Sequence, residues 1–226
     1  MSSCGVIIPA YQAEAHVGDV VRRCRVQTEV AGVIVVDDGS ADATGDAARA
    51  AGAHLLTHLV NRGKGAALMT GFREASALGW EAAITLDADG QHDPNDIPRF
   101  IAECHRTRAD IVVGARARAS TPMPLPRRLS NRLSSAVVSR LAGTPIPDSQ
   151  SGYRLVARRV WELLPLSRMR YDFESEILIR AARHGYVIVS LPIETHYADE
   201  KSHFRPFRDT ARMIGVFWSL FREGQG

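Results

Sequence analysis

The chain has 226 residues and a mass of 24.7 kDa, which suits a single α/β domain large enough to bury a complete sheet. Its three cysteines, Cys4, Cys24 and Cys104, are far apart and lack the paired spacing of metal ligands, which argues against a disulfide framework or a zinc site and favours a reducing, cytoplasmic compartment. No signal peptide is visible and no window approaches 18 uninterrupted apolar residues, so we expect neither secretion by that route nor a membrane span.

The net charge of +3 conceals an asymmetry between the two halves of the chain. Residues 1–105 carry a net charge of −6 and residues 106–226 a net charge of +9. An acidic half could hold a cation, and a basic half could attract phosphate or an anionic membrane. Because 26 of the 28 basic residues are arginine, compositional bias is the alternative explanation for many of them. No aromatic stacking platform accompanies them, so we do not expect a nucleic-acid partner.

Strand and helix patterns alternate through the first half of the chain. Apolar runs at 5–8 and 32–36 predict buried parallel strands, and apolar residues at helical spacing predict a helix over 15–28. The alternation then continues with helices over 43–51, 64–78 and 95–106 and with strands over 54–57, 82–86 and 111–113. This order predicts an α/β fold with a doubly wound, mostly parallel sheet and flanking helices, in which ligands gather at the carboxyl ends of the strands.

After residue 116 the pattern becomes less regular, and a Pro-rich stretch precedes a predicted helix over 127–141. A further helix is predicted over 174–184, followed by strands over 187–190 and 193–197. We assign residues 1–205 to one domain and residues 206–226 to an amphipathic C-terminal helix that belongs to the same domain or forms an interface. Its apolar residues are flanked by Arg208, Arg212 and Arg222, so it could lie on a membrane surface or pack on protein.

The most informative stretch follows the predicted strand over 82–86 and contains Asp87 and Asp89. Two carboxylates this close repel each other unless a cation offsets them, and hard oxygen ligands favour Mg²⁺ or Mn²⁺. A solvated turn is the alternative, because Asp-Gly is common in turns.

Several blocks together resemble a known family. The order and spacing of these blocks is similar to that of family-2 inverting glycosyltransferases, in the dolichol-phosphate or polyprenyl-phosphate mannosyltransferase branch, over about residues 4–205. The blocks are Ile8-Pro9-Ala10-Tyr11, Val36-Asp37-Asp38-Gly39-Ser40, Asn61-Arg62-Gly63-Lys64-Gly65, the DXD motif Asp87-Ala88-Asp89 with Gly90-Gln91-His92, Gly114-Ala115-Arg116 and Ser151-Gly152-Tyr153-Arg154.

The resemblance implies a GT-A fold and a nucleotide-sugar donor carrying GDP or UDP. It implies a nucleotide site formed by Pro9, Ala10, Tyr11, Glu14, Asp38, Lys64, Asp87 and Ala88. It also implies an Mn²⁺ or Mg²⁺ site formed by Asp87, Asp89 and Gln91, with Gln91 a direct ligand or one that acts through water. Such an ion would stabilise the leaving nucleoside diphosphate while the configuration at the anomeric carbon inverts, and Asp89 is therefore counted among the catalytic residues.

The favoured acceptor is a lipid phosphate, which is an anionic nucleophile and needs no strong base. Guanidinium groups suit phosphate capture, so Arg116 and Arg154 are expected at both the reacting atoms and the acceptor phosphate, with Arg128 and Lys201 as further phosphate contacts. If the acceptor is instead a hydroxyl of a glycan or lipid, Glu176 is the candidate general base, although acidic residues in a first helical turn need no such role.

Departures from the family pattern leave other readings open. Gln12 and Ala13 replace the usual Asn-Glu, which makes Glu14 the nearest carboxylate and gives some support to a noncatalytic nucleotide-binding subunit. A phosphatase-type Asp-x-Asp nucleophile normally lies on the first strand, whereas Asp87 follows about the fourth. We expect a cytoplasmic enzyme. It could also associate peripherally with the inner face of a membrane or bind a membrane partner.

Overall fold

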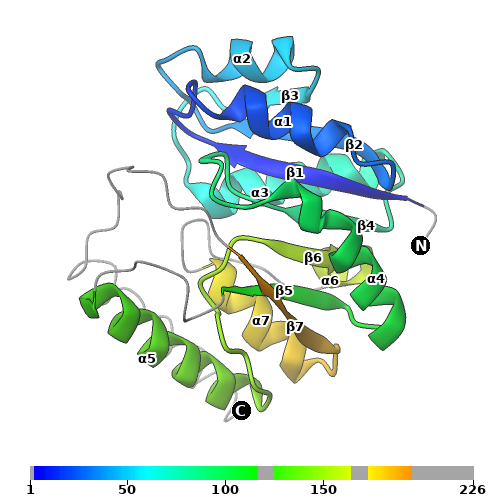
Figure 1. The fold of residues 1–226 in the computed structure, drawn as a ribbon, viewed down its shortest axis with the longest axis vertical. Coiled ribbons are helices and arrows are strands. Elements are labelled where there is room, and N and C mark those ends of the chain that lie inside the picture. Colours follow the sequence, from blue (N-terminus) through cyan, green and yellow to red (C-terminus); the bar gives the residue numbers. More distant parts are fainter. Residues whose placement is uncertain (1–2, 117–124, 164–172, 195–226) are drawn as a thin grey trace.

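The computed structural model describes residues 3–116, 125–163 and 173–194, with side chains from residue 130 onward in the second range. Within them, seven strands form one sheet with the order β3-β2-β1-β4-β6-β5-β7 (Figure 1). The strands are β1 (Cys4–Ala10), β2 (Val30–Asp37), β3 (His54–Thr57), β4 (Ala82–Thr85), β5 (Ile111–Arg116), β6 (Arg154–Ala157) and β7 (Ile188–Ile193). The helices are α1 (Val17–Arg25), α2 (Thr44–Ala50), α3 (Lys64–Ala77), the 3₁₀ turn η1 (Pro94–Asp96), α4 (Ile97–Thr107), α5 (Leu125–Ala142), α6 (Arg158–Leu163) and α7 (Phe173–Arg183).

The sheet is parallel except for β6, which runs antiparallel to both of its neighbours. Its first residue, Arg154, lies opposite Thr85 at the carboxyl end of β4 and opposite Val113 on β5. The segment before β6 therefore reaches the same edge of the sheet as the segments after β1, β2, β4 and β5.

Apolar side chains cover both faces of the sheet and form two hydrophobic cores. On β1, Ile7 belongs to one core and Val6 and Ile8 to the other, because successive side chains of a strand point to opposite faces. The first core contains residues of α3, α6 and α7, and the second contains residues of α1, α2 and α4. Burial on both faces explains why the strands read as nearly continuous apolar runs in the sequence.

The expected mostly parallel α/β sheet is confirmed, and most predicted elements occur within a few residues of their expected bounds. Two expectations are corrected. The sequence analysis assigned no strand to 154–157, where β6 lies, and it predicted two strands where the structure has the single strand β7 up to Ile193. The predicted C-terminal helix, and residues 195–197 of the predicted last strand, lie outside the described residues.

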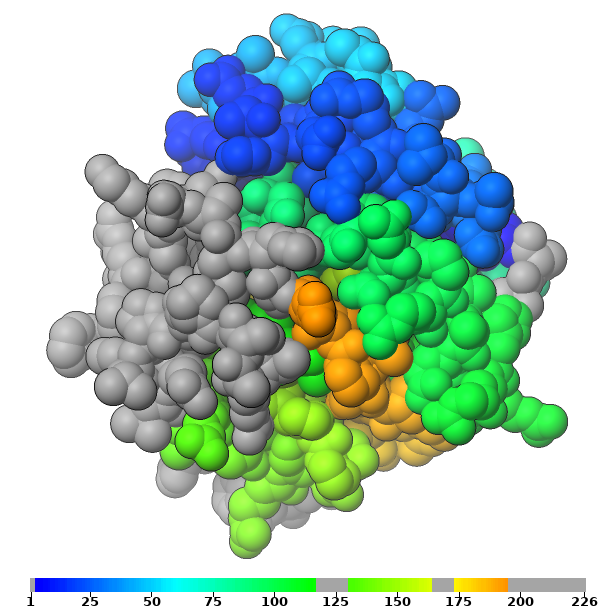
Figure 2. Space-filling view, viewed as in Figure 1, coloured from blue at the N-terminus to red at the C-terminus, as the bar shows by residue number. Residues whose placement is uncertain are grey.

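No helix in the described ranges combines the length and the apolar character that a membrane span requires. In the space-filling view, the N-terminal elements (blue and cyan) and the later elements (yellow-green and orange) occupy opposite sides of the molecule (Figure 2). The edge formed by the carboxyl ends of β1, β2, β4 and β5 thus receives segments from both halves of the chain.

Candidate active site

The segment after β1 is tied to the segment after β2 by hydrogen bonds. Backbone N–H groups of Gln12 and Ala13 donate to Ser40 Oγ (2.9 Å) and Thr44 Oγ1 (2.7 Å). Glu14 Oε2 accepts from the backbone N–H of residue 43, at the start of α2 (2.9 Å). Glu14, expected to contact the nucleotide, thus bonds to the N-terminus of α2, where an acidic side chain is favoured by the helix dipole. Nearby, Pro9 and Ala10 end β1, and the side chain of Tyr11 is exposed.

Asp38 follows β2 and organises the segment that leads to Lys64. Its Oδ1 accepts hydrogen bonds from Arg62 N (2.9 Å) and contacts His58 Nδ1 (2.6 Å), and its Oδ2 accepts from Gly63 N (2.7 Å). The other ring nitrogen of His58 lies 3.0 Å from Thr70 Oγ1 on α3. Asp38 is buried, and its carboxylate fixes the backbone of the two residues that precede α3. His58 lies outside the sequence blocks that predicted the site.

Lys64 begins α3 and lies between two carboxylates. Its Nζ is 2.5 Å from Asp87 Oδ1 and 2.6 Å from Glu174 Oε1, and we refer to these three residues as the Lys64 cluster. Burial alone would raise the pKa of Asp87, but Lys64, with smaller effects from His92 and Arg116, lowers it to about 2. Burial alone would likewise lower the pKa of Lys64, but the two carboxylates raise it. All three groups of the cluster are thus drawn together by charge, with Glu174 buried and Lys64 and Asp87 partly exposed.

Gly152, in the segment before β6, leaves room for the Lys64 cluster. A Cβ atom at this position would lie 2.7 Å from Asp87 Oδ2 and 2.8 Å from Lys64 Nζ. Such distances are too short for carbon, so the cluster packs against the backbone here only because residue 152 has no side chain. Glu174 Oε1 is fully buried, and apart from the Lys64 ammonium 2.6 Å away no described group donates a hydrogen bond to it.

Asp89 and Gln91 follow Asp87 in the same turn, where Asp89 Oδ1 accepts from Gln91 N (3.0 Å). His92 Nδ1 accepts from Asp87 N (3.2 Å), and burial lowers the pKa of His92 to about 4, so its ring is neutral at pH 7. No group of three or more His, Cys, Asp or Glu side chains in the described ranges is arranged to hold a metal by itself. Two carboxylates and an amide oxygen nevertheless fit a hard ion whose remaining ligands are substrate phosphates and water, as is usual for Mg²⁺.

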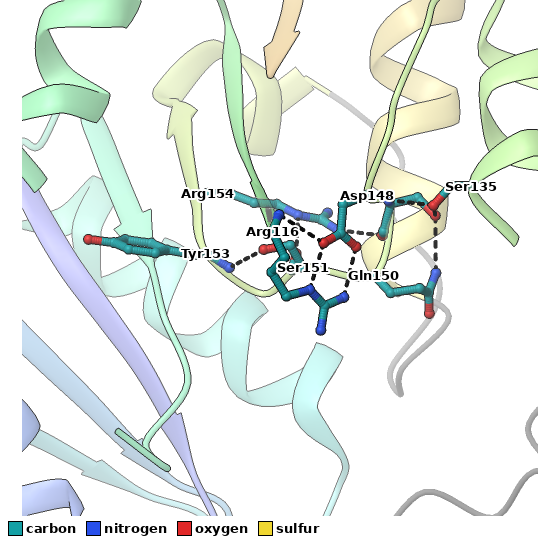
Figure 3. A network of polar contacts seen from close by, with 8 residues as sticks. Arg116, Ser135, Asp148, Gln150, Ser151, Tyr153 and Arg154 are labelled. Atoms are coloured by element: carbon teal, nitrogen blue, oxygen red, sulfur yellow. Dashed lines mark hydrogen bonds and ion pairs between the residues drawn. The ribbon is translucent and has the colours of Figure 1, made fainter. Parts of the chain in front are cut away.

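Arg116, at the end of β5, forms a bidentate ion pair with Asp148 (Figure 3). Arg116 Nε lies 2.6 Å from Oδ2 and one terminal nitrogen lies 2.8 Å from Oδ1. Burial would raise the pKa of Asp148, but the guanidinium outweighs this effect and lowers it. The pair lies close enough to Asp87 for Arg116 to contribute to the lowering of the pKa of that carboxylate. Asp148 precedes the block at 151–154 and belongs to none of the predicted motifs.

Arg154, expected to bind the acceptor phosphate, is 3% exposed and donates to three backbone carbonyl groups. Its Nε bonds to Ser151 O (2.8 Å), and its two terminal nitrogens bond to Ser149 O (2.8 Å) and Glu174 O (2.7 Å). Burial lowers its pKa, although Glu174, Asp148 and Asp87 act in the opposite direction. The guanidinium thus joins the segment before β6 to the start of α7, and Figure 3 shows Arg154 in the same network of polar contacts as Ser151 and Asp148.

A cluster of buried hydroxyl groups completes the arrangement around Gln150. Its side-chain amide nitrogen is within hydrogen-bond distance of Ser134 Oγ (3.1 Å), Ser149 Oγ (3.3 Å) and Ser175 Oγ (3.2 Å). Ser135 Oγ accepts from Ser149 N (3.0 Å). These contacts join α5, the segment before β6 and α7. Isolated serines give no sequence signal for such a cluster, and the prediction missed it.

The structure distinguishes two neighbouring glutamates on α7. Glu176, the candidate base, is fully buried and its Oε1 lies 3.0 Å from Arg180 Nε, one turn further along the same helix. Glu174 instead contacts Lys64. Arg128 belongs to α5, but its side chain, like the whole of Lys201, lies outside the described residues.

Comparison with known proteins agrees with this geometry. The family model "Glycosyl transferase family 2" matches residues 5–164. A UDP-N-acetylglucosamine–dolichyl-phosphate N-acetylglucosaminyltransferase of Methanococcus voltae is 32% identical, over 95% of this chain and 93% of its own. An undecaprenyl-phosphate mannosyltransferase of Micrococcus luteus is also 32% identical, over 83% of this chain and 81% of its own.

A solved structure supports the fold. The Mycobacterium tuberculosis glucosyl-3-phosphoglycerate synthase, crystallised with Mn²⁺, UDP and phosphoglyceric acid, superposes with a TM-score of 0.75 over 97% of this chain and 78% of its own, at 21% identity. This likeness confirms the GT-A type of α/β fold that the sequence motifs predicted. The matched family model covers more than half of the chain, and the named relatives act on polyprenyl-type phosphates. The chain belongs to glycosyltransferase family 2.

Proposed function

We propose that the protein is a metal-dependent, inverting glycosyltransferase that moves a sugar from a nucleoside-diphosphate donor to a polyprenyl phosphate. The observation that carries the proposal is the Lys64 cluster at the sheet edge, beside Asp89 and the Arg116–Asp148 pair. The acceptors named for the 32% identical relatives support a lipid phosphate. Such an acceptor lies in a membrane, so the protein would act at a membrane surface.

The donor side of the site would use the acidic turn and α3. We assign the divalent ion, Mn²⁺ or Mg²⁺, to Asp87 and Asp89 with Gln91, and such an ion offsets negative charge on a diphosphate. The start of α3 would offer backbone N–H groups and the Lys64 ammonium to the same diphosphate. Pro9, Ala10, Tyr11 and Ala88 would line the nucleoside. Asp38 and Glu14 would support it indirectly, through the hydrogen bonds that fix the two neighbouring segments.

The acceptor side would rely on positive charge. An oxygen of the lipid phosphate attacks the anomeric carbon, the bond from that carbon to the diphosphate breaks, and the diphosphate leaves with the electron pair. An ionised phosphate has no proton to lose, so this step requires no general base. Arg116 would hold the acceptor phosphate, with Arg128 and Lys201 as further contacts, and Asp148 would fix the direction of its guanidinium. We assign Arg154 a positioning role, because its described contacts are backbone carbonyl groups.

The test is transfer of labelled sugar from GDP- and UDP-sugars to polyprenyl phosphate in detergent or vesicles, with Mn²⁺ or Mg²⁺. We expect an organic-soluble product of inverted anomeric configuration, loss of activity with EDTA, and a decrease of about 100-fold or more for Asp89→Asn. Asp46→Asn is the matched control, because Asp46 lies on the surface of α2 and pairs with Arg49. Full activity of Asp89→Asn would refute the metal assignment. Transfer to hydroxyl acceptors alone would refute the lipid-phosphate acceptor, and binding without transfer would favour a noncatalytic subunit.

A further inference from the structure

Lys64 is in contact with both carboxylates of its cluster, and this contributes to the charge that the site presents to a ligand. Its ammonium offsets one of the negative charges of Asp87 and Glu174. Together with Asp89 these side chains carry a net charge of −2, which the buried Arg154 guanidinium near Glu174 and Asp87 partly offsets. A cation that binds Asp87 must compete with an ammonium that already lies 2.5 Å from its Oδ1.

Glu174 gives the ammonium an alternative anchor. Its Oε1 is 2.6 Å from Nζ, it is buried, and no other described group donates a hydrogen bond to it. Its backbone carbonyl is fixed by Arg154, so this carboxylate is held at the start of α7. Gly152 leaves the adjoining side of the cluster without a side chain. Lys64 can therefore release Asp87 without leaving the site or losing all compensation for its charge.

From this geometry, and resting on the proposed function, we propose that Lys64 changes partners during donor binding. In the ligand-free protein it bridges Asp87 and Glu174. When a divalent cation and a diphosphate bind, it releases Asp87 to the cation, contacts the diphosphate and stays paired with Glu174. Glu174 is then a positioning residue, and binding of the cation and the nucleotide is coupled through Lys64.

The proposal predicts that two substitutions change the Mn²⁺ affinity in opposite directions relative to wild type. Free Mn²⁺ is measured by electron paramagnetic resonance during titration of the purified protein, first without nucleotide and then with UDP or GDP. We expect Lys64→Met to bind Mn²⁺ at least tenfold more tightly than wild type without nucleotide, because the competing ammonium is gone. Glu174→Gln should bind Mn²⁺ more weakly than wild type, because the ammonium then has Asp87 as its remaining carboxylate.

Two further variants control for folding and for general effects of charge. Arg73→Met removes an exposed positive charge from the same helix and should leave Mn²⁺ affinity unchanged. The double variant Lys64→Met with Glu174→Gln leaves fewer unpaired buried charges than Lys64→Met alone. It should still bind Mn²⁺ more tightly than wild type, and it serves as the test if the single variant does not fold.

The outcomes separate this proposal from the proposed function. If Asp89→Asn abolishes Mn²⁺ binding but removal of Lys64 leaves the affinity unchanged or lowers it, partner exchange is refuted and the metal site stands. If Asp89→Asn binds Mn²⁺ as well as wild type, the metal site itself is refuted. A Glu174→Gln affinity equal to that of wild type would refute the anchoring role of Glu174.

Discussion

Replacement of Arg154 by methionine distinguishes a positioning role from direct contact with the acceptor. Arg154→Met removes three hydrogen bonds from a charged donor and leaves the carbonyl groups of residues 149, 151 and 174 without that partner. Each such bond contributes about 1.5–3 kcal/mol. The variant no longer buries a positive charge, which offsets part of the stability lost with the three hydrogen bonds. Removal of one member of a buried charged network typically costs about 3–5 kcal/mol. For a chain of this size that corresponds to a fall in Tm of roughly 6–20 °C.

The assay is urea and thermal unfolding of wild type, Arg154→Met and the control Arg158→Met. Arg158 pairs with Glu162 one turn further along α6, and both side chains are 39% exposed, so we expect the control to change stability by no more than about 0.5 kcal/mol. An Arg154→Met protein that unfolds within about 2 °C of wild type but has a raised KM for the acceptor would refute the positioning role. Such a result would instead support direct contact between Arg154 and the acceptor phosphate.

Two further substitutions test the site. In Gly152→Ala the added Cβ atom would lie 2.7 Å from Asp87 Oδ2 and displace this carboxylate, a metal ligand in the proposed site, so we expect at least a tenfold loss of Mn²⁺ binding in the presence of nucleotide. In the control Gly18→Ala a Cβ atom would lie 3.4 Å from its nearest neighbours, so we expect normal binding, and equal binding by both variants would contradict the packing argument. Asp148→Asn tests the ion pair with Arg116. Because folding lowers the pKa of Asp148, the ionised carboxylate stabilises the folded protein at pH values above its unfolded pKa. This stabilisation is lost as the pH falls through the folded pKa. The difference in unfolding free energy between wild type and Asp148→Asn should therefore be largest near pH 7 and shrink as the pH falls below the unfolded pKa of 3.8, and a pH-independent difference would contradict it.

The fold of the N-terminal half could be predicted because each element there has a clear periodicity and a clear end. The strand over 54–57 occurs where predicted, and α3 starts at Lys64 as expected. β6 could not be predicted in this way, because it has four residues, begins with a buried arginine and passes directly into α6. Its antiparallel direction depends on its neighbours in the sheet, which periodicity does not specify.

The chemistry of single residues is enough to nominate candidates for the site, whereas the contacts between them depend on the fold. The sequence predicted Lys64 and Asp87 as site residues, and they are in contact. It preferred Glu176 to Glu174, but residues two apart face different sides of a helix, and the packing of α7 directs Glu174 to Lys64. A guanidinium can donate hydrogen bonds to phosphate or to carbonyl groups, so its burial and its carbonyl contacts were needed to propose a positioning role for Arg154.

The hydrogen bonds between the segments after β1 and β2 have a consequence for the rate and cost of ligand binding. Gln12, Ala13 and Glu14 are already held by Ser40, Thr44 and the start of α2 without any ligand. A segment that is ordered beforehand loses little conformational entropy when a ligand arrives, whereas each rotamer-rich side chain immobilised on binding costs about 0.5–1.5 kcal/mol. Mutations that remove these hydrogen bonds should therefore weaken donor affinity, because the free protein would be less ordered and would lose more conformational entropy on binding. The contacts to the bound donor would stay the same.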